Sequence, residues 1–159
     1  MGSMEWLAIA LSVALIGGLV AAVLWRQRGR FRFLDSSVVQ ARKTFHLRRE
    51  WLEANFFKLA SRSGKPRGLE WIDCDFEDAV QFARDRHTGH LLALVAVTIR
   101  FAALEGGGME DNPNVGNLRA ATAVFLLDGK EWSTSGRAIF NLNPSETIVH
   151  LREELELAE

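Results

Sequence analysis

The stretch "ATAVFLLDGKEWSTSGRAIF", residues 121–140, decides the fold class. Its first half alternates between apolar and other side chains, as a strand with one buried face does. The dipeptide Asp128-Gly129 then gives a tight hairpin signal. Its second half alternates again through Trp132, Thr134, Ala138 and Phe140. The stretch therefore predicts two antiparallel strands joined by a tight turn.

Strand patterns also precede this hairpin. Residues 91–101 predict a long strand with one continuous apolar face, formed by Leu91, Ala93, Val95, Val97, Ile99 and Phe101. Residues 105–117, which contain Gly106-Gly107-Gly108, predict a loop, and residues 84–90 predict a turn. From residue 69 the period is two, so Ile72, Cys74 and Phe76 are expected to point inward together. Residues 80–82 continue as a strand or form a short helix.

Helical patterns flank the strands on both sides. Asp35-Ser36-Ser37 offers N-cap oxygens, and apolar residues follow at helical spacing: Val38, Ala41, Phe45, Leu52, Phe56 and Leu59. Some of these recur every seven residues, but the second seam of a coiled coil is missing, which favours an amphipathic helix ending near Ala60. Residues 143–146, Asn-Pro-Ser-Glu, start a last helix with Ile148, Leu151 and Leu155 inward.

These patterns predict an α+β fold with an antiparallel β-meander of four to five strands and with helices packed on one face. The expected divisions are an N-terminal tail and transmembrane helix (1–25), a basic connector and amphipathic helix (26–63), and a sheet with a C-terminal helix (64–159). A chain of 159 residues fits one folded domain plus an appendage.

The appendage is an uncharged run of twenty residues from Trp6 to Trp25. As a helix it spans roughly 30 Å, the thickness of the hydrocarbon core of a bilayer. A cleaved signal peptide wants basic residues before a shorter apolar core, whereas the residues before this run are MGSME. The run therefore predicts an uncleaved single-pass transmembrane helix, and a buried helix of a soluble protein is the alternative.

Charge predicts the orientation of this helix. No Lys or Arg precedes it, and a basic cluster follows at Arg26, Arg28, Arg30 and Arg32. The positive-inside rule places the N-terminus outside and the domain in the cytoplasm, at the inner membrane. Residues 26–68 carry 12 Lys/Arg against 3 Asp/Glu, and residues 69–159 carry 7 against 16. We expect the arginine cluster to contact anionic lipid headgroups, and nothing in the sequence predicts a nucleic-acid reader.

Small residues recur every four positions in the membrane run, at Ala10, Ala14, Gly18 and Ala22. A stripe of this kind allows a second helix to approach closely. We therefore expect a protein partner or self-association through this stripe of the transmembrane helix.

The hairpin at residues 121–140, with its Asp-Gly-Lys-x-Trp turn, resembles the closing hairpin of NTF2-like (SnoaL-like) domains. The resemblance covers about a third of the chain, which departs from that family by having one long helix before the sheet and a helix after it. It implies a curved sheet around a pocket, in a family that contains both enzymes and scaffolds. The local sequence also resembles uncharacterised single-pass membrane-anchored bacterial proteins, which implies no activity.

Several groups of side chains are candidates for chemistry. The acidic cluster Asp73, Asp75, Glu77 and Asp78 suits a cation or acid-base chemistry, and a solvated strand face is the alternative. His87 and His90 flank a turn without a third ligand, and nothing pairs His46 with His150. Cys74 alternates onto the apolar face, which indicates an inert thiol. The three consecutive glycines lack the Gly-Lys-Ser/Thr ending of a phosphate-binding loop.

Arg100, Arg119 and Arg137 are the candidate small-molecule site, on the less apolar side of the sheet. No catalytic residue, metal site or cofactor is predicted. The sequence favours a membrane-anchored, non-enzymatic binding or scaffold module in the cytoplasm. The alternative is a small NTF2-like enzyme or ligand-binding domain with a pocket under the sheet.

Overall fold

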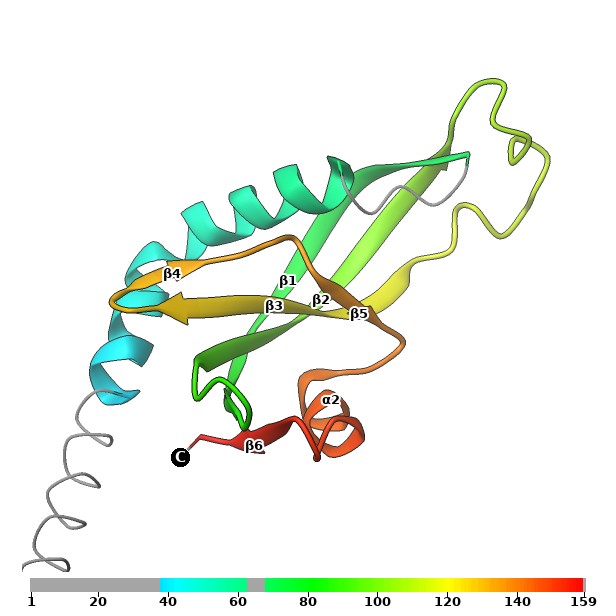
Figure 1. Ribbon diagram of the computed structural model, residues 1–159. Coiled ribbons are helices and arrows are strands. Elements are labelled where there is room, and N and C mark those ends of the chain that lie inside the picture. The colour runs from blue at the N-terminus through cyan, green and yellow to red at the C-terminus, as the bar shows by residue number, and fades with distance from the viewer. Residues whose placement is uncertain (1–37, 63–67, 159) are drawn as a thin grey trace, which may run out of the picture. The chain divides into compact units, whose positions relative to one another are not determined.

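The computed structural model describes residues 38–62 and 68–158. The chain divides into two compact units, Met1–Val39 and Gln40–Glu159, and the description below concerns the second. The described residues form an α+β fold with two helices and a six-stranded antiparallel sheet (Figure 1). The predicted fold class is thus confirmed, although the sheet has more strands than the four to five expected.

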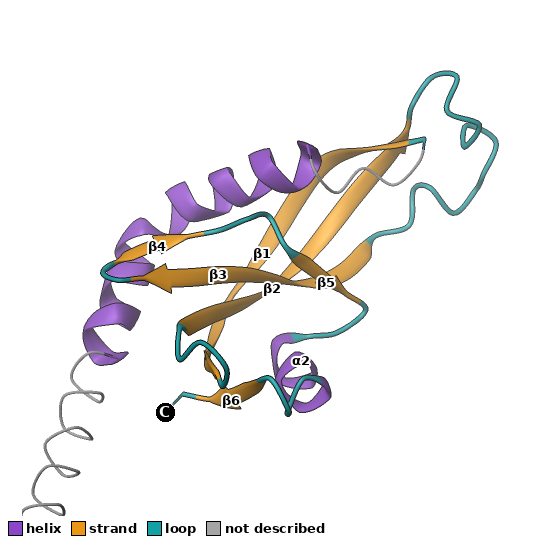
Figure 2. Cartoon of the chain, viewed as in Figure 1, coloured by secondary structure: helices purple, strands orange, loops and turns teal. Residues whose placement is uncertain are grey.

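A long helix (residues 38–62) comes first and the strands follow. In chain order the other elements are β1 (Leu69–Asp85), β2 (Leu91–Ala103), β3 (Arg119–Asp128), β4 (Glu131–Ser133), β5 (Ala138–Phe140), α2 (Pro144–His150) and β6 (Leu155–Leu157). The strand order is β4-β3-β2-β1-β6, and β5 also pairs with β3 (Figure 2). The segment at residues 80–82 is therefore strand and not helix.

The long helix packs on one face of the sheet through aromatic side chains. Phe45 is fully buried and meets the rings of Phe82, Phe125 and Trp132 at centroid distances of 5.8, 5.4 and 5.0 Å. The indole Nε1 of Trp132 donates to the carbonyl of Ala41 at 2.9 Å, which satisfies the one polar atom of a buried indole. This face is the predicted apolar face of the sheet.

The opposite face is covered only at one end. There Leu92, Leu94 and Ala83 form a buried cluster with Leu155, and Ile148 from α2 packs against it. The residues next to Leu92 and Leu94 along β2 are Ala93 and Val95. They point to the other face, because successive side chains of a strand alternate. The two helices therefore lie on opposite faces of the sheet. The prediction of helices on one face is wrong, because an unbroken apolar run such as residues 91–95 needs cover on both faces.

The C-terminal region also departs from the prediction. Asn143 caps α2 with the predicted capping box, in which the side chains of Asn143 and Glu146 bond each other's backbone N–H groups. The helix ends at His150, however, and Leu155 belongs to β6, which pairs with the end of β1. Leu155 therefore reaches the core from a strand, while Ile148 does so from the helix as predicted.

The hairpin at residues 121–140 forms with its turn at the predicted place, since Asp128 pairs with Glu131. Its returning strand is divided into β4 and β5. Between them the Thr134 hydroxyl donates to the carbonyl of Val124 at 2.9 Å, and Gly136 has a φ of 77°. A Cβ on Gly136 would lie 2.5 Å from the backbone nitrogen of Ala60, so the break lets the strand pass close under the long helix.

Two irregularities interrupt the pairing of β1 with β2, one between Trp71 and Asp73 and one between Phe76 and Val80. Each places extra residues on β1, as a β-bulge does. The first turns Ile72 outward, where 46% of it is exposed. The prediction that Ile72 points inward together with Cys74 and Phe76 is therefore wrong for Ile72.

Among residues 38–62 and 68–158, no helix combines the length and apolar character needed to cross a membrane. The predicted transmembrane helix at Trp6–Trp25 lies outside the described residues. The small-residue stripe within it and the arginines at positions 26, 28, 30 and 32 also lie outside them.

Candidate functional site

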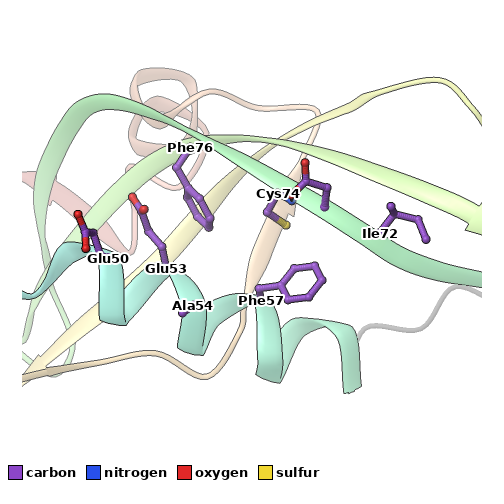
Figure 3. A pocket seen from close by; sticks show the side chains of 8 residues that line it. Glu50, Glu53, Ala54, Phe57, Ile72, Cys74 and Phe76 are labelled. Atoms are coloured by element: carbon purple, nitrogen blue, oxygen red, sulfur yellow. The ribbon is translucent and has the colours of Figure 1, made fainter.

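An open groove of about 370 Å³ lies between the long helix and the N-terminal half of β1. It is lined by Glu50, Glu53, Ala54 and Phe57 from the helix and by Ile72, Asp73, Cys74 and Phe76 from the strand. Figure 3 shows Glu53 and Phe57 pointing toward β1, and Phe76 pointing toward the helix. The groove thus has an apolar floor between side chains of two elements and carboxylates along its rim.

Arg49 connects the helix to the second bulge of β1. Its guanidinium donates to the backbone carbonyls of Glu77 and Asp78, and its Nε lies 2.6 Å from a carboxylate oxygen of Glu53. A bulge leaves carbonyls without ladder partners, and a planar guanidinium has enough donors to satisfy two of them and a carboxylate together. Arg49 therefore ties the long helix to the second bulge of β1, and the carboxylate of Glu53 balances its charge.

Cys74 and Asp73 lie at the middle of the groove. Burial, and secondarily the Asp73 carboxylate, raise the pKa of the Cys74 thiol to about 12. A thiol with this pKa stays protonated at neutral pH and is a poor nucleophile. Asp73 accepts the N–H of Cys74 at 2.9 Å through Oδ1. The inert thiol predicted from the sequence is supported, although the side chain is half-buried and not fully enclosed.

The acidic cluster is divided by the fold. Asp73 and Asp75 pair in register with Arg100 and Thr98 on the face of the sheet opposite the long helix. Glu77 and Asp78 lie in the second bulge, where strict alternation fails. In the described part of the chain, no three His, Cys, Asp or Glu side chains come together in a way that would hold a metal ion.

A second cavity of about 630 Å³ lies beside the end of β1 and is lined by Arg42, His46, Val80, Gln81, Phe82, Leu157 and Ala158. Arg42 lies over the ring of Phe82 at 5.1 Å and donates through Nη2 to the carbonyl of Ala158 at 2.6 Å. Its Nε is buried and has no hydrogen-bond partner. This guanidinium ties the long helix to the C-terminal segment.

The structure does not gather the three arginines of the candidate small-molecule site. Arg100 lies on the open part of the face opposite the long helix, whereas Arg119 pairs with Ile99, which points to the helix side. The backbone carbonyl of Arg137 accepts the N–H of Val124 at 3.1 Å, and Val124 pairs with Leu94 on β2. Arg100 and Leu94 are six positions apart along β2, which is roughly 20 Å. Neither cavity described above is lined by any of the three.

The histidines and the glycine-rich loop have local environments that explain them without a ligand. His46, His87, His90 and His150 are exposed. The Asp85 carboxylate accepts the backbone N–H groups of Thr88 and His87, and these bonds lower the pKa of Asp85. These two hydrogen bonds stabilise the turn between β1 and β2.

The loop at Gly106–Gly108 places backbone N–H groups close to the carboxyl group of Glu110. Backbone N–H groups, first that of Glu110 itself and then those of Gly106, Gly107 and Met109, lower the pKa of the Glu110 carboxyl. A Cβ on Gly107 would lie 2.7 Å from the Cα of Gly68, so the loop packs tightly at the start of β1.

Sequence reasoning missed the groove and the role of Arg49. The bulge that frees the carbonyls of Glu77 and Asp78 has no glycine or proline to mark it, and Arg49 looks like one of several helix-surface charges. The one available signal of the bulge was the interrupted apolar alternation between Phe76 and Val80, at residues 77–79 (Glu-Asp-Ala).

Comparison of the chain with protein families, with curated proteins and with solved structures found no match. The resemblances to NTF2-like domains and to membrane-anchored bacterial proteins therefore stay predictions.

Proposed function

We propose that this protein is a single-pass membrane protein whose C-terminal domain lies in the cytoplasm and works as a binding module rather than as an enzyme. The observation that carries the proposal is the uncharged run Trp6–Trp25 followed by Arg26, Arg28, Arg30 and Arg32. This order matches a membrane-spanning helix with its basic end in the cytoplasm.

The state of the groove side chains supports a binding role over catalysis. Glu53 is neutralised by Arg49, Asp73 is engaged by a backbone N–H, and the thiol of Cys74 is held protonated. General acid-base or nucleophilic catalysis needs a group whose pKa is tuned toward neutral pH and that reaches its substrate. These groups serve the fold instead and leave an apolar, acid-rimmed surface.

The basic connector supports a position close to the bilayer. Each Lys or Arg near an anionic leaflet contributes about 1 kcal/mol of attraction, and residues 69–159 carry the opposite net charge. The connector is thus drawn to lipid headgroups while the acidic sheet is repelled by them. The sheet and its groove then face the cytoplasm, where a protein partner can reach them.

The topology is tested with reporters fused after Glu159 in the full chain. A fluorescent protein that matures only in the cytoplasm should be active there, and alkaline phosphatase, which needs export, should be inactive. A control variant carries Gln at positions 26, 28, 30 and 32 and three added Lys after Met1, and it should invert both signals. An active phosphatase on the unmodified chain overturns the orientation. Loss of the protein from the membrane at alkaline pH overturns the anchor.

A ligand-binding role for the domain remains the alternative, and the cavity at Arg42 favours it because the buried Nε of this half-buried guanidinium has no hydrogen-bond partner. A small anion that binds this cavity should raise the thermal midpoint of the full chain, and Arg42→Met should abolish the shift. A screen of small carboxylates and phosphates by thermal shift measures this directly.

A further inference from the structure

The N-terminal half of β1 is an edge of the sheet. β2 pairs along one side of β1 from Leu69 to Arg84, while on the other side β6 pairs only with Ala83–Asp85. Within residues 38–62 and 68–158, no strand pairs with the outer side of residues 69–81. An unpaired edge offers backbone N–H and C=O groups to a further strand.

Part of this edge is blocked and part is open. The carbonyls of Glu77 and Asp78 already accept from Arg49, so the edge is closed at the second bulge. Cys74 donates its N–H to the exposed Asp73 side chain, which indicates that this amide points to the free edge, and an added strand would replace this one side-chain bond. In an antiparallel pair a residue directs its N–H and C=O to the same side. The open part is therefore Ile72–Phe76.

The open edge lies along the groove. On the helix side of the strand the groove presents Ala54, Phe57 and Phe76, and the exposed Ile72 lies at the right-hand end of the view in Figure 3. On the opposite face of the strand lies the exposed Asp75, in register with Thr98, and at the free edge itself lies the exposed carboxylate of Asp73, which accepts the N–H of Cys74. An added strand would thus meet an apolar surface on one face and carboxylates on the other.

We propose that the edge Ile72–Phe76 binds an extended segment of a partner protein in which apolar and basic residues alternate. Successive side chains of a strand point to opposite faces, so the apolar residues enter the groove and the Lys or Arg residues pair with Asp73 and Asp75. Main-chain hydrogen bonds give such a complex its affinity and the side-chain pockets its specificity. The proposal names the partner class of the proposed binding module, yet it does not depend on the membrane topology.

The test uses the full chain in non-ionic detergent micelles and a fluorescent probe, acetyl-Lys-Val-Lys-Val-Lys-Val-amide, followed by anisotropy. Two control probes accompany it: the same length with Glu in place of Lys, and the Lys probe with N-methyl groups on alternate amides. We expect saturable binding of the Lys probe, with each control at least about tenfold weaker because it loses the charge pairs or the backbone bonds. Absence of saturable binding up to about 1 mM overturns the proposal, as does equal binding of the N-methylated probe.

Matched variants separate the edge from general attraction to an acidic domain. Asp75→Lys reverses a carboxylate beside the open edge, and Glu131→Lys reverses an exposed one on β4 at the other side of the sheet. We expect the first to weaken the probe about fivefold or more and the second to change it less than about twofold. Equal losses in the two variants overturn the proposal. The topology reporters are read on the same variants, so a failure of edge binding and a failure of the membrane anchor remain distinguishable.

Discussion

The two halves of β1 differ in their surroundings although they belong to one strand. In the C-terminal half, Phe82 is buried under the long helix and Ala83 is buried in the cluster with α2 and β6. In the N-terminal half, Ile72 and the acidic residues are exposed, two bulges interrupt the ladder, and the outer side lacks a partner strand among the described residues. In the C-terminal half, burial of both faces therefore occurs together with strand pairing on both edges. The N-terminal half, which pairs on one edge only among the described residues, is exposed to solvent.

The largest expected difference between the halves comes from a buried charge. Ala83→Asp places a carboxylate at a fully buried position and should cost more than about 3 kcal/mol in free energy of unfolding, enough to unfold the domain. Ala79→Asp lies in the exposed second bulge and should change stability by less than about 0.5 kcal/mol. Urea denaturation of the two full-length variants, followed by circular dichroism, measures the difference. Similar losses would show that the bulge is as buried as the core.

A second pair of variants compares two phenylalanines of the strand. Phe82 is 6% exposed and meets Phe45 and Trp132, so Phe82→Ala should cost about 3–5 kcal/mol. Phe76 is half-buried at the groove, so Phe76→Ala should cost about 1–2 kcal/mol. The same denaturation experiment serves both. A larger loss at Phe76 than at Phe82 would contradict the contrast between the halves.

Arg49 provides a smaller test, since it connects the helix to the bulge. Arg49→Met keeps the aliphatic stem and removes the donors to Glu77 and Asp78, and it should cost about 1 kcal/mol. Arg48→Met is the matched control, because Arg48 is exposed and its change should be within about 0.5 kcal/mol. If the two variants have the same stability, the bulge does not depend on the guanidinium.

The effect expected at Cys74 depends on pH. Its pKa is raised from 9.0 to about 12, so the folded state holds the thiol proton more tightly than the unfolded state does. Stability from this group is therefore present below pH 9 and is lost as pH rises from 9 toward 12. We expect the wild type to lose more stability than Cys74→Ala between pH 8 and about 10.5. At pH 8 the native thiol should also react with maleimide more slowly than the unfolded thiol, and equal rates would contradict the raised pKa.

Much of the fold follows from the sequence because local patterns carry it. The hairpin turn at Asp128-Gly129, the capping box at Asn143 and the apolar face of β2 are each encoded within a few residues. The side of the sheet on which α2 packs was not predictable in the same way. It depends on which face of residues 92–94 stays uncovered after the long helix has packed, which is a tertiary property.

The groove was harder to predict for a related reason. Alternation placed Ile72, Cys74 and Phe76 on one face, but a bulge of one or two residues shifts the alternation, and neither bulge has a glycine to mark it. The exposure of Asp73 and Asp75 could be predicted from the sequence. The hydrogen bonds from Arg49 to the backbone carbonyls of Glu77 and Asp78 could not, because they depend on the helix packing beside the strand.

Amide hydrogen exchange at Cys74 is the most direct test of the open edge. The Cys74 N–H donates to the exposed carboxylate of Asp73, whereas the N–H of Arg86, directly after β1, donates to the backbone of Glu154 at 2.7 Å. In the full chain in micelles we expect a protection factor at Cys74 at least about tenfold lower than at Arg86. The Lys probe should raise the protection of Cys74 and leave Arg86 unchanged. A Cys74 amide as protected as that of Arg86 in the free protein would contradict an open edge at Ile72–Phe76.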